Sequence, residues 1–172
     1  MKLYLKVPTK EELFYRQEWL KNPLTMSYNA GYDLDLKGYD KNTGIINKND
    51  DEMLEWYQSW INNTNERFFA YIYVENVEVP IGEVYYYLSD DKYNIGILID
   101  YKFRGNGYSY EALKLLCKEA KQNNICALYD QFEIDRTNTL KIFEKVGFKK
   151  VEEVEIKKFD KIVKSIIIKI EL

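Results

Sequence analysis

The sequence contains no histidine, which restricts the chemistry open to the protein. A Ser-His-Asp triad, a Cys-His pair and an HExxH zinc site are all excluded, and we expect no metal centre. Any acid–base chemistry must therefore fall to Asp, Glu, Tyr, Lys, Cys, a chain terminus or water.

Cysteine is also scarce, since only Cys117 and Cys126 are present. Two cysteines in a chain of this size are typical of a reducing compartment with free thiols. Residues 1–10 lack the apolar core of a signal peptide, and no apolar run approaches the roughly 18–20 residues that span a bilayer. We therefore expect a cytoplasmic protein with no membrane partner.

Proline and glycine, three and eight in 172 residues, are too few for a linker or a low-complexity protein. The length favours one domain over residues 1–172. The net charge is −3, from 25 basic and 28 acidic residues. Because a nucleic-acid-binding domain usually carries a strong basic excess, we expect no nucleic-acid partner.

Hydrophobic periodicity predicts an α+β fold. A short strand over residues 3–7 precedes a helix that starts at the capping box of residues 9–12 and ends before Asn22-Pro23. Residues 24–50 read as a long loop, of a length that is usually functional or mobile. The second helix is DEMLEWYQSWIN, with Asn49 or Asp50 as its N-cap.

The second half of the chain reads mainly as strands. Three consecutive strands, a helix over 108–123, a strand, a short helix ending at Gly147 and two final strands follow one another. The predicted order is βααβββαβαββ, a mixed and mostly antiparallel sheet of six to seven strands with about four helices. The strand segments are RFFAYIYVE, VPIGEVYYYLS, YNIGILID, ALYDQFEID and the two halves of the tail from Lys149.

The most informative segment is the glycine-rich loop at residues 104–109, RGNGYS, between a buried strand and an amphipathic helix. Its glycines allow a sharp turn, and its amides converge with the helix N-terminus on one point suited to a pyrophosphate. Asn-Gly also forms hairpin turns, but a strand should then follow, not a helix. The Walker motif and GxGxxG are both absent.

This segment resembles the acyl-CoA-binding motif of GNAT-type N-acetyltransferases, Gln/Arg-x-x-Gly-x-Gly/Ala between a strand and a helix. Arg104 and Gly107 occupy the first and fourth positions, and Ser109 replaces the last small residue. LKIFEKVGF at 140–148 resembles the family's short helix ending in Gly-Phe, and the element order matches along nearly all of the chain.

The resemblance implies that the fourth and fifth strands splay, and that acetyl-CoA lies in the gap. Strand backbone would pair with the pantetheine arm, and loop amides would hold the pyrophosphate. The implied cofactor contacts are Ile97, Leu98, Ile99, Arg104, Gly105, Asn106, Gly107, Tyr108, Ser109, Tyr110 and Asn138.

The family's usual acid–base positions are all altered. Phe143 stands where a tyrosine often protonates the leaving thiolate, and Gln131 and Tyr93 stand where a glutamate often acts as base. Three other carboxylates are candidates for the base, namely Glu83, Glu133 and Asp135. The competing interpretation is that all three are solvated strand carboxylates.

The resemblance places the acceptor wall in the loop of residues 24–50 and the second helix. The predicted substrate contacts are Tyr28, Asn29, Tyr32, Asp33 and Trp56, whereas Trp60 is expected to pack in the core. Six carboxylates between Asp33 and Glu52 would suit a cationic amine or would simply be solvated.

The sequence thus predicts an N-acetyltransferase that moves an acetyl group from acetyl-CoA to a primary amine, a small molecule, by direct attack in a ternary complex. Two alternatives remain open, a CoA-binding or sensor domain with weak turnover and a protein N-terminal or lysine acetyltransferase. The oligomeric state is open too, with a homodimer as one alternative.

Overall fold

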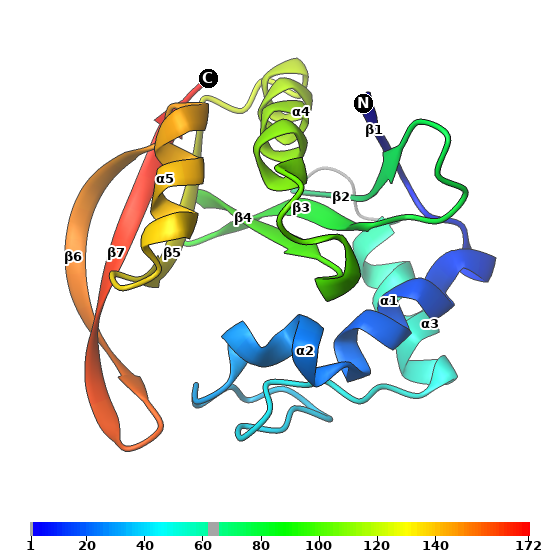
Figure 1. The fold of residues 1–172 in the computed structure, drawn as a ribbon, viewed down its shortest axis with the longest axis horizontal. Helices are drawn as coiled ribbons and strands as arrows, with labels where there is room; N and C mark the ends of the chain where they lie inside the picture. The colour runs from blue at the N-terminus through cyan, green and yellow to red at the C-terminus, as the bar shows by residue number, and fades with distance from the viewer. Residues whose placement is uncertain (1, 62–65) are drawn as a thin grey trace.

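A computed structural model describes residues 2–61 and 66–172. Its seven strands form one sheet in the order β1-β2-β3-β4-β5-β7-β6, which confirms the predicted fold class (Figure 1). The strands are β1 (Leu3–Lys6), β2 (Arg67–Val74), β3 (Gly82–Ser89), β4 (Lys92–Ile99), β5 (Ala127–Glu133), β6 (Lys149–Lys158) and β7 (Lys161–Glu171). The helices are α1 (Leu13–Lys21), α2 (Pro23–Met26), α3 (Asp50–Ile61), α4 (Tyr108–Gln122) and α5 (Thr137–Val146).

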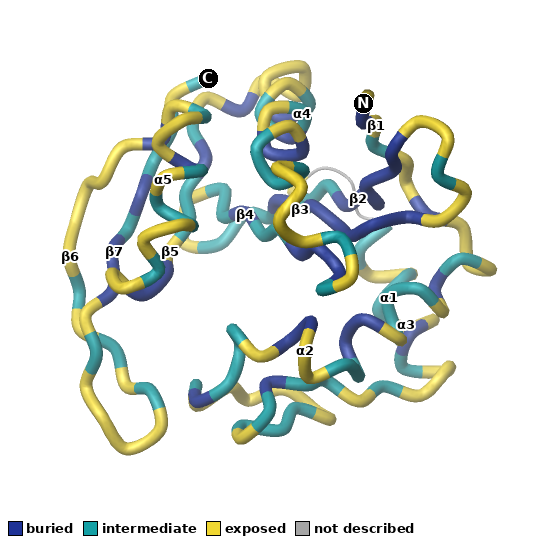
Figure 2. The backbone as a smooth tube through the Cα atoms, in the orientation of Figure 1, coloured by how far each residue is buried: buried dark blue, intermediate teal, exposed yellow. Residues whose placement is uncertain are grey.

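The sheet divides the molecule into two layers (Figure 1). Helices α4 and α5 cover one face, where Leu113 and Leu116 of α4 are fully buried against the strands. Helices α1 and α3 and the irregular segment after α2 cover the other face, around the buried rings of Trp19, Phe69 and Tyr71. Figure 2 shows the buried backbone concentrated in the central strands, with β6 largely exposed.

The three consecutive strands β2, β3 and β4 form an antiparallel meander. Asn76 lies in the left-handed region with φ of 68°, and Asp90 and Asp91 have φ of 49° and 59°. Asparagine and aspartate tolerate this region better than other non-glycine residues. Gly147 has φ of 120° at the end of α5, as predicted.

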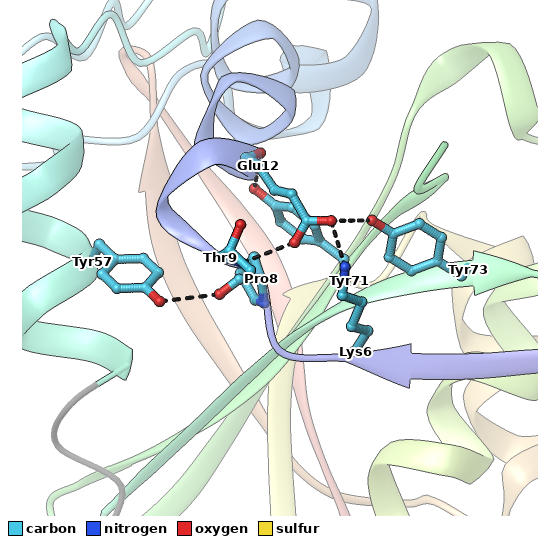
Figure 3. A network of polar contacts seen from close by, with 7 residues as sticks. All are labelled: Lys6, Pro8, Thr9, Glu12, Tyr57, Tyr71 and Tyr73. Atoms are coloured by element: carbon cyan, nitrogen blue, oxygen red, sulfur yellow. Dashed lines mark hydrogen bonds and ion pairs between the residues drawn. The ribbon is translucent and has the colours of Figure 1, made fainter. Parts of the chain in front are cut away.

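A polar network surrounds Glu12, which directly precedes helix α1 (Figure 3). Glu12 accepts hydrogen bonds from the Thr9 amide at 2.9 Å and the Tyr73 hydroxyl at 3.0 Å, and an ion pair joins it to Lys6 at 2.6 Å. The Tyr71 hydroxyl donates to the Glu12 carbonyl at 3.2 Å. The predicted capping box is therefore present, although its first turn is a 3₁₀ turn, Lys10–Glu12, ahead of α1.

One predicted loop boundary differs from the structure. The loop predicted from residue 24 begins with helix α2 and a 3₁₀ turn, Ser27–Asn29, because the Asn22 side chain caps the Leu24 amide and Pro23 fits the first helical position. Helix α3 is described as far as Ile61, and predicted helix residue Asn62 lies outside the described residues. No helix in the described part of the chain is long and apolar enough to cross a membrane.

Strands β4 and β5 are the one parallel pair among the described strands, and they are joined by a single residue pair, Asn94 with Tyr129. By contrast, β4 pairs with β3 along its whole length, from Gly82–Ile99 to Ser89–Lys92. The edge of β4 that faces β5 is therefore open beyond Asn94. This opening positions the site described next.

Candidate active site

A backbone cradle follows β4. The chain passes through a 3₁₀ turn, Tyr101–Phe103, and then a loop that leads directly into α4. Gly105 and Gly107 have φ of 83° and 76°, so both occupy the left-handed region that glycine enters without strain. The Asn106 side chain donates to the carbonyls of Phe103 and Arg104, which holds the loop closed on itself. The loop leads into the N-terminus of α4, and the dipole of a helix favours an anion at that end.

The Arg104 side chain links this loop to neighbouring backbone. Its guanidinium donates to the carbonyls of Ile99 at 3.0 Å, Leu24 at 3.0 Å and Thr25 at 2.5 Å. These bonds tie the cradle to α2 on the opposite side of the sheet edge. The side chain of Arg104 is therefore engaged with backbone carbonyls, and the loop amides stay the predicted anion-binding groups.

Two cavities adjoin the open edge of β4. The cradle cavity, of about 280 Å³, lies between β4, the loop and helices α4 and α5. The gap cavity, of about 400 Å³, begins where β4 and β5 separate and opens toward the segment after α2. The two share Tyr28, Ile97, Arg136, Thr139 and Phe143, so they are adjacent.

The cofactor implied by the family resemblance fits this architecture. An extended arm that carries amides matches an open strand edge, as in strand addition. A pyrophosphate matches converging amides at the start of a 15-residue helix. Ile97, Leu98, Ile99, Arg104 and Ser109 line the cradle cavity. Asn138 is exposed and outside both linings, and its neighbour Thr139 lines both.

The predicted acceptor residues separate into two groups. Tyr28, Asn29 and Tyr32 line the gap cavity. Asp33 is exposed and pairs with Lys41 at 2.5 Å and Lys157 at 3.3 Å, outside the cavity lining. Trp56 lies beneath the Arg16 guanidinium, whose carbon is 4.0 Å from the ring centre. Neither of the last two residues is part of the lining.

Glu83 is buried in the sheet, with 2% of its surface exposed. An ion pair of 3.1 Å joins its Oε2 to Nε of Arg16, which is itself stacked on Trp56. Burial raises the pKa of Glu83 from its usual value, and Arg16 opposes that shift. Glu83 lines neither cavity, so its surroundings are those of a structural ion pair.

Glu133 and Asp135 do not line the gap cavity, but they line a neighbouring cavity of about 480 Å³ that shares Tyr28 and Arg136 with it. Glu133 is buried and pairs with Lys158, and Arg136 lies 3.9 Å away. Although burial alone would raise it, the pKa of Glu133 is lowered by hydrogen bonds from Lys158 and Tyr32. Asp135 is exposed in the loop before α5. Their assignment as the base stays a prediction, as does that of Glu83.

Residues that the sequence analysis did not single out complete the gap cavity. Tyr85 and Tyr87 of β3 and Asp130 of β5 line it. A Cβ at Gly96 would collide with the Tyr85 ring, so this glycine lets the ring lie across β4. The alternation in EVYYYL marked the tyrosines as one face of a strand. No local signal, however, marked where β4 and β5 part, and therefore none marked Asp130.

Burial raises the pKa of the Asp130 carboxyl to about 7, against a smaller opposing effect of Arg136. Tyr28 has a pKa raised to about 12, because burial and the charge of Glu83 outweigh the nearby arginines. Near neutral pH the cavity therefore holds a protonated phenol and a carboxyl that titrates. Such perturbed groups in a cleft are typical of functional sites.

Comparison with known proteins agrees with this geometry. A family model described as the acetyltransferase (GNAT) domain matches residues 2–149. The chain belongs to the GNAT acetyltransferase family. Membership confirms the predicted family and the predicted class of enzyme, an acetyltransferase. A search of the curated proteins finds no significant match.

Solved GNAT structures share the fold across nearly the whole chain. Spermidine N-acetyltransferase from Vibrio cholerae, in complex with CoA and spermine, is 15% identical with a TM-score of 0.79, covering 98% of this chain and 95% of that one. RimL, a ribosomal L7/L12 alpha-N-protein acetyltransferase in complex with CoA, is 13% identical with a TM-score of 0.79 and coverage of 100% and 95%. YncA from Salmonella typhimurium, with its cofactor acetyl-CoA, is 13% identical with a TM-score of 0.75 and coverage of 99% and 94%.

Proposed function

We propose that this GNAT protein transfers the acetyl group of acetyl-CoA to a primary amine of a small molecule, by direct attack in a ternary complex. One observation carries the proposal, namely that the cradle cavity and the gap cavity adjoin at the five residues that line both. A cofactor and an acceptor can thus meet without either leaving its own half of the site.

The cradle half of the site binds the cofactor through groups of the backbone. Amides of residues 105–110 and the N-terminus of α4 bind the pyrophosphate, and the open edge of β4 at Ile97–Ile99 orients the arm. When bound, acetyl-CoA supplies the acetyl thioester. Holding the two reactants side by side removes much of the entropic cost of their encounter.

The acceptor half suits a cation in a confined space. Tyr28, Tyr32, Tyr85 and Tyr87 present ring surfaces that attract an ammonium group. The segment after α2 forms one wall of this half, and the Tyr39 hydroxyl braces it by donating to the carbonyls of Asn29 and Tyr32. These features support a small amine over the exposed end of a protein chain.

Direct attack is supported by the state of the two cysteines. Burial raises the pKa of the Cys117 thiol to about 11, so that it is protonated and a poor nucleophile at neutral pH. Cys126 is exposed, and it lines neither of the two cavities. An acyl-cysteine intermediate therefore has no suitable residue in the described part of the chain.

The experiment is amine-dependent release of CoA, followed as free thiol, with putrescine, tyramine and lysine methyl ester as small acceptors. A peptide with a free N-terminus and an internal lysine serves as the protein-like acceptor. We expect release with at least one small amine, faster than with the peptide and above hydrolysis without any acceptor.

Faster reaction with the peptide would contradict the small-molecule proposal and favour a protein acetyltransferase. Binding of acetyl-CoA without release for any acceptor would favour the sensor alternative. Mass spectrometry of the acetylated product distinguishes transfer from hydrolysis in each case.

A further inference from the structure

Asp130 occupies a particular place in the sheet. Tyr129 is the last residue of β5 that pairs with β4, and Asp130 is the next residue, at the point where the strands separate. On the other side of the gap, Ile95 and Gly96 follow the paired Asn94 and line the same cavity. The carboxyl of Asp130 is thus at the apex of the opening, which the cradle cavity approaches from the α4 side.

We propose that Asp130 is the general base of the transfer, which takes a proton from the ammonium of the acceptor in the gap cavity. The inference rests on the proposed function and names a group within the same site. It differs from the three carboxylates that the sequence indicated, because Asp130 alone among these four lines the gap cavity.

The proton balance of the step is simple. An ammonium, R–NH₃⁺, gives one proton to the Asp130 carboxylate and becomes the neutral amine R–NH₂, whose lone pair is then available for attack. Asp130 becomes a neutral carboxylic acid, and it returns the proton to solvent after the product leaves. No oxidant, metal or further reactant is required.

The groups around Asp130 leave its carboxylate available. One oxygen, Oδ1, accepts the Gln131 amide at 2.8 Å. Arg136, before α5, is the other charged side chain of the described cavity lining, and it forms an ion pair with Glu133, not with Asp130. From β3 and the segment after α2, the titratable groups are Tyr85, Tyr87, Tyr28 and Tyr32, which are all neutral phenols near pH 7 because their pKa values are raised.

The state of Asp130 matches the task. A base works best when its pKa lies near the working pH, and burial brings that of Asp130 to about 7. Glu83 and Glu133, by contrast, are each committed to a basic partner. Taking up a proton at either would break an ion pair inside the protein, which is costly.

The first test measures the carboxyl itself, without any cofactor or amine. Protein labelled with carbon-13 at the aspartate side-chain carboxyl is titrated by NMR from pH 4 to pH 9, and the Asp130 signal is assigned by its loss in Asp130→Asn. We expect a midpoint near 7. A midpoint below about 5, close to an ordinary aspartate, would overturn the proposal.

The second test compares Asp130→Asn with Asp91→Asn, a matched control in the exposed turn between β3 and β4. With the best small amine, Asp130→Asn should lower kcat/KM about 10²–10⁴-fold at pH 7, with the loss shrinking toward pH 10 as free amine accumulates. In the wild type, kcat/KM should rise with pH around 7 as Asp130 loses its proton, and this rise should be absent from Asp130→Asn. CoA affinity should be unchanged in both variants, and Asp130→Glu should recover at least about tenfold of the loss.

The outcomes separate the two proposals. Wild-type protein that acetylates no amine would overturn the proposed function and this inference with it. Wild-type turnover that Asp130→Asn retains, with the same rise near pH 7, would overturn the role of Asp130 alone. A loss of CoA affinity equal to the loss of kcat/KM would show that Asp130 supports the fold of the site, and would also overturn it.

Discussion

The two halves of the site differ in the groups that form them. The cradle half consists of backbone: two glycines with positive φ, the first turn of α4 and the open edge of β4. The gap half consists of side chains, with tyrosines from two elements, Phe143 and a single carboxyl at the point where β4 and β5 separate. The backbone half suits a ligand that all members of a family share, whereas the side-chain half can change with the acceptor.

A second contrast lies within the acceptor side of the molecule. Glu83 and Glu133 are buried carboxylates that form ion pairs, whereas Asp130 lines the gap cavity and forms no ion pair with any described residue. The neighbours of each carboxyl therefore distinguish them. Under the proposal above, the ion pairs hold the wall of the pocket in place and Asp130 acts as the base.

The largest effect on stability is expected at Arg16, the partner of the buried carboxylate of Glu83. Arg16→Met keeps the stacking on Trp56 but leaves Glu83 buried without a partner, so the free energy of unfolding should fall by about 3 kcal/mol at pH 7. The pKa of Glu83 is already raised in the folded state, and the variant raises it further. Stability should therefore fall as pH rises above the unfolded value of 4.5, and the defect should be smaller near pH 4.

Urea unfolding at pH 4.5 and pH 7.5 measures this change. Lys114→Met is the matched control, because it removes an exposed ion pair with Glu111 on α4 and should cost less than about 0.5 kcal/mol. An equal loss in the two variants, or an Arg16→Met defect that does not depend on pH, would contradict the structural role of Glu83.

The next effect tests the backbone character of the cradle. Gly107→Val forces a β-branched residue to φ of 76°, which should distort the loop and lower CoA affinity at least about tenfold, or ~1.4 kcal/mol. Ser109→Ala removes only a hydroxyl in the first turn of α4 and should change affinity less than about threefold. Calorimetric titration with CoA, alongside a thermal melt of each variant, measures both; a reversed order would show that side chains, not amides, hold the cofactor.

The smallest effect is expected at Phe143, where the two halves meet. Phe143 is 2% exposed and lies 5.5 Å from Phe132 and 5.0 Å from Phe148, measured between ring centres. Phe143→Tyr puts a hydroxyl at the cavity boundary, and it should raise turnover less than about tenfold, because a thiol of pKa near 8.5 already leaves readily. Phe148→Tyr, outside both cavities, is the control and should lower stability without any gain in turnover.

Steady-state kinetics with the best amine measures this difference. Phe143→Leu tests the packing role itself. If this variant lost turnover while its stability and CoA binding stayed normal, Phe143 would be more than a packing residue.

Local sequence signals were sufficient for the cradle. The glycine loop and the helix that follows it depend on neighbours along the chain, and both form where their residues predicted. Helix α2 was missed because its one turn depends on a cap and a proline, without any hydrophobic period.

The gap half depends on contacts between distant segments. Asp130 became visible only once the structure showed that β4 and β5 pair at one residue and then part. From its place on the strand, Glu83 was a candidate for the base. The structure shows that Arg16 of α1, distant in the sequence, forms an ion pair with it. Which carboxyl is paired and which is exposed to a cavity is a tertiary property that no single strand encodes.

A crystal structure with CoA bound would show whether the two cavities form one site. The pyrophosphate should lie on the amides of residues 105–110, the arm along Ile97–Ile99, and the thiol in the gap cavity between Asp130 and Phe143. A thiol that ends outside the gap cavity, or an arm that leaves the space between β4 and β5 empty, would contradict a single site.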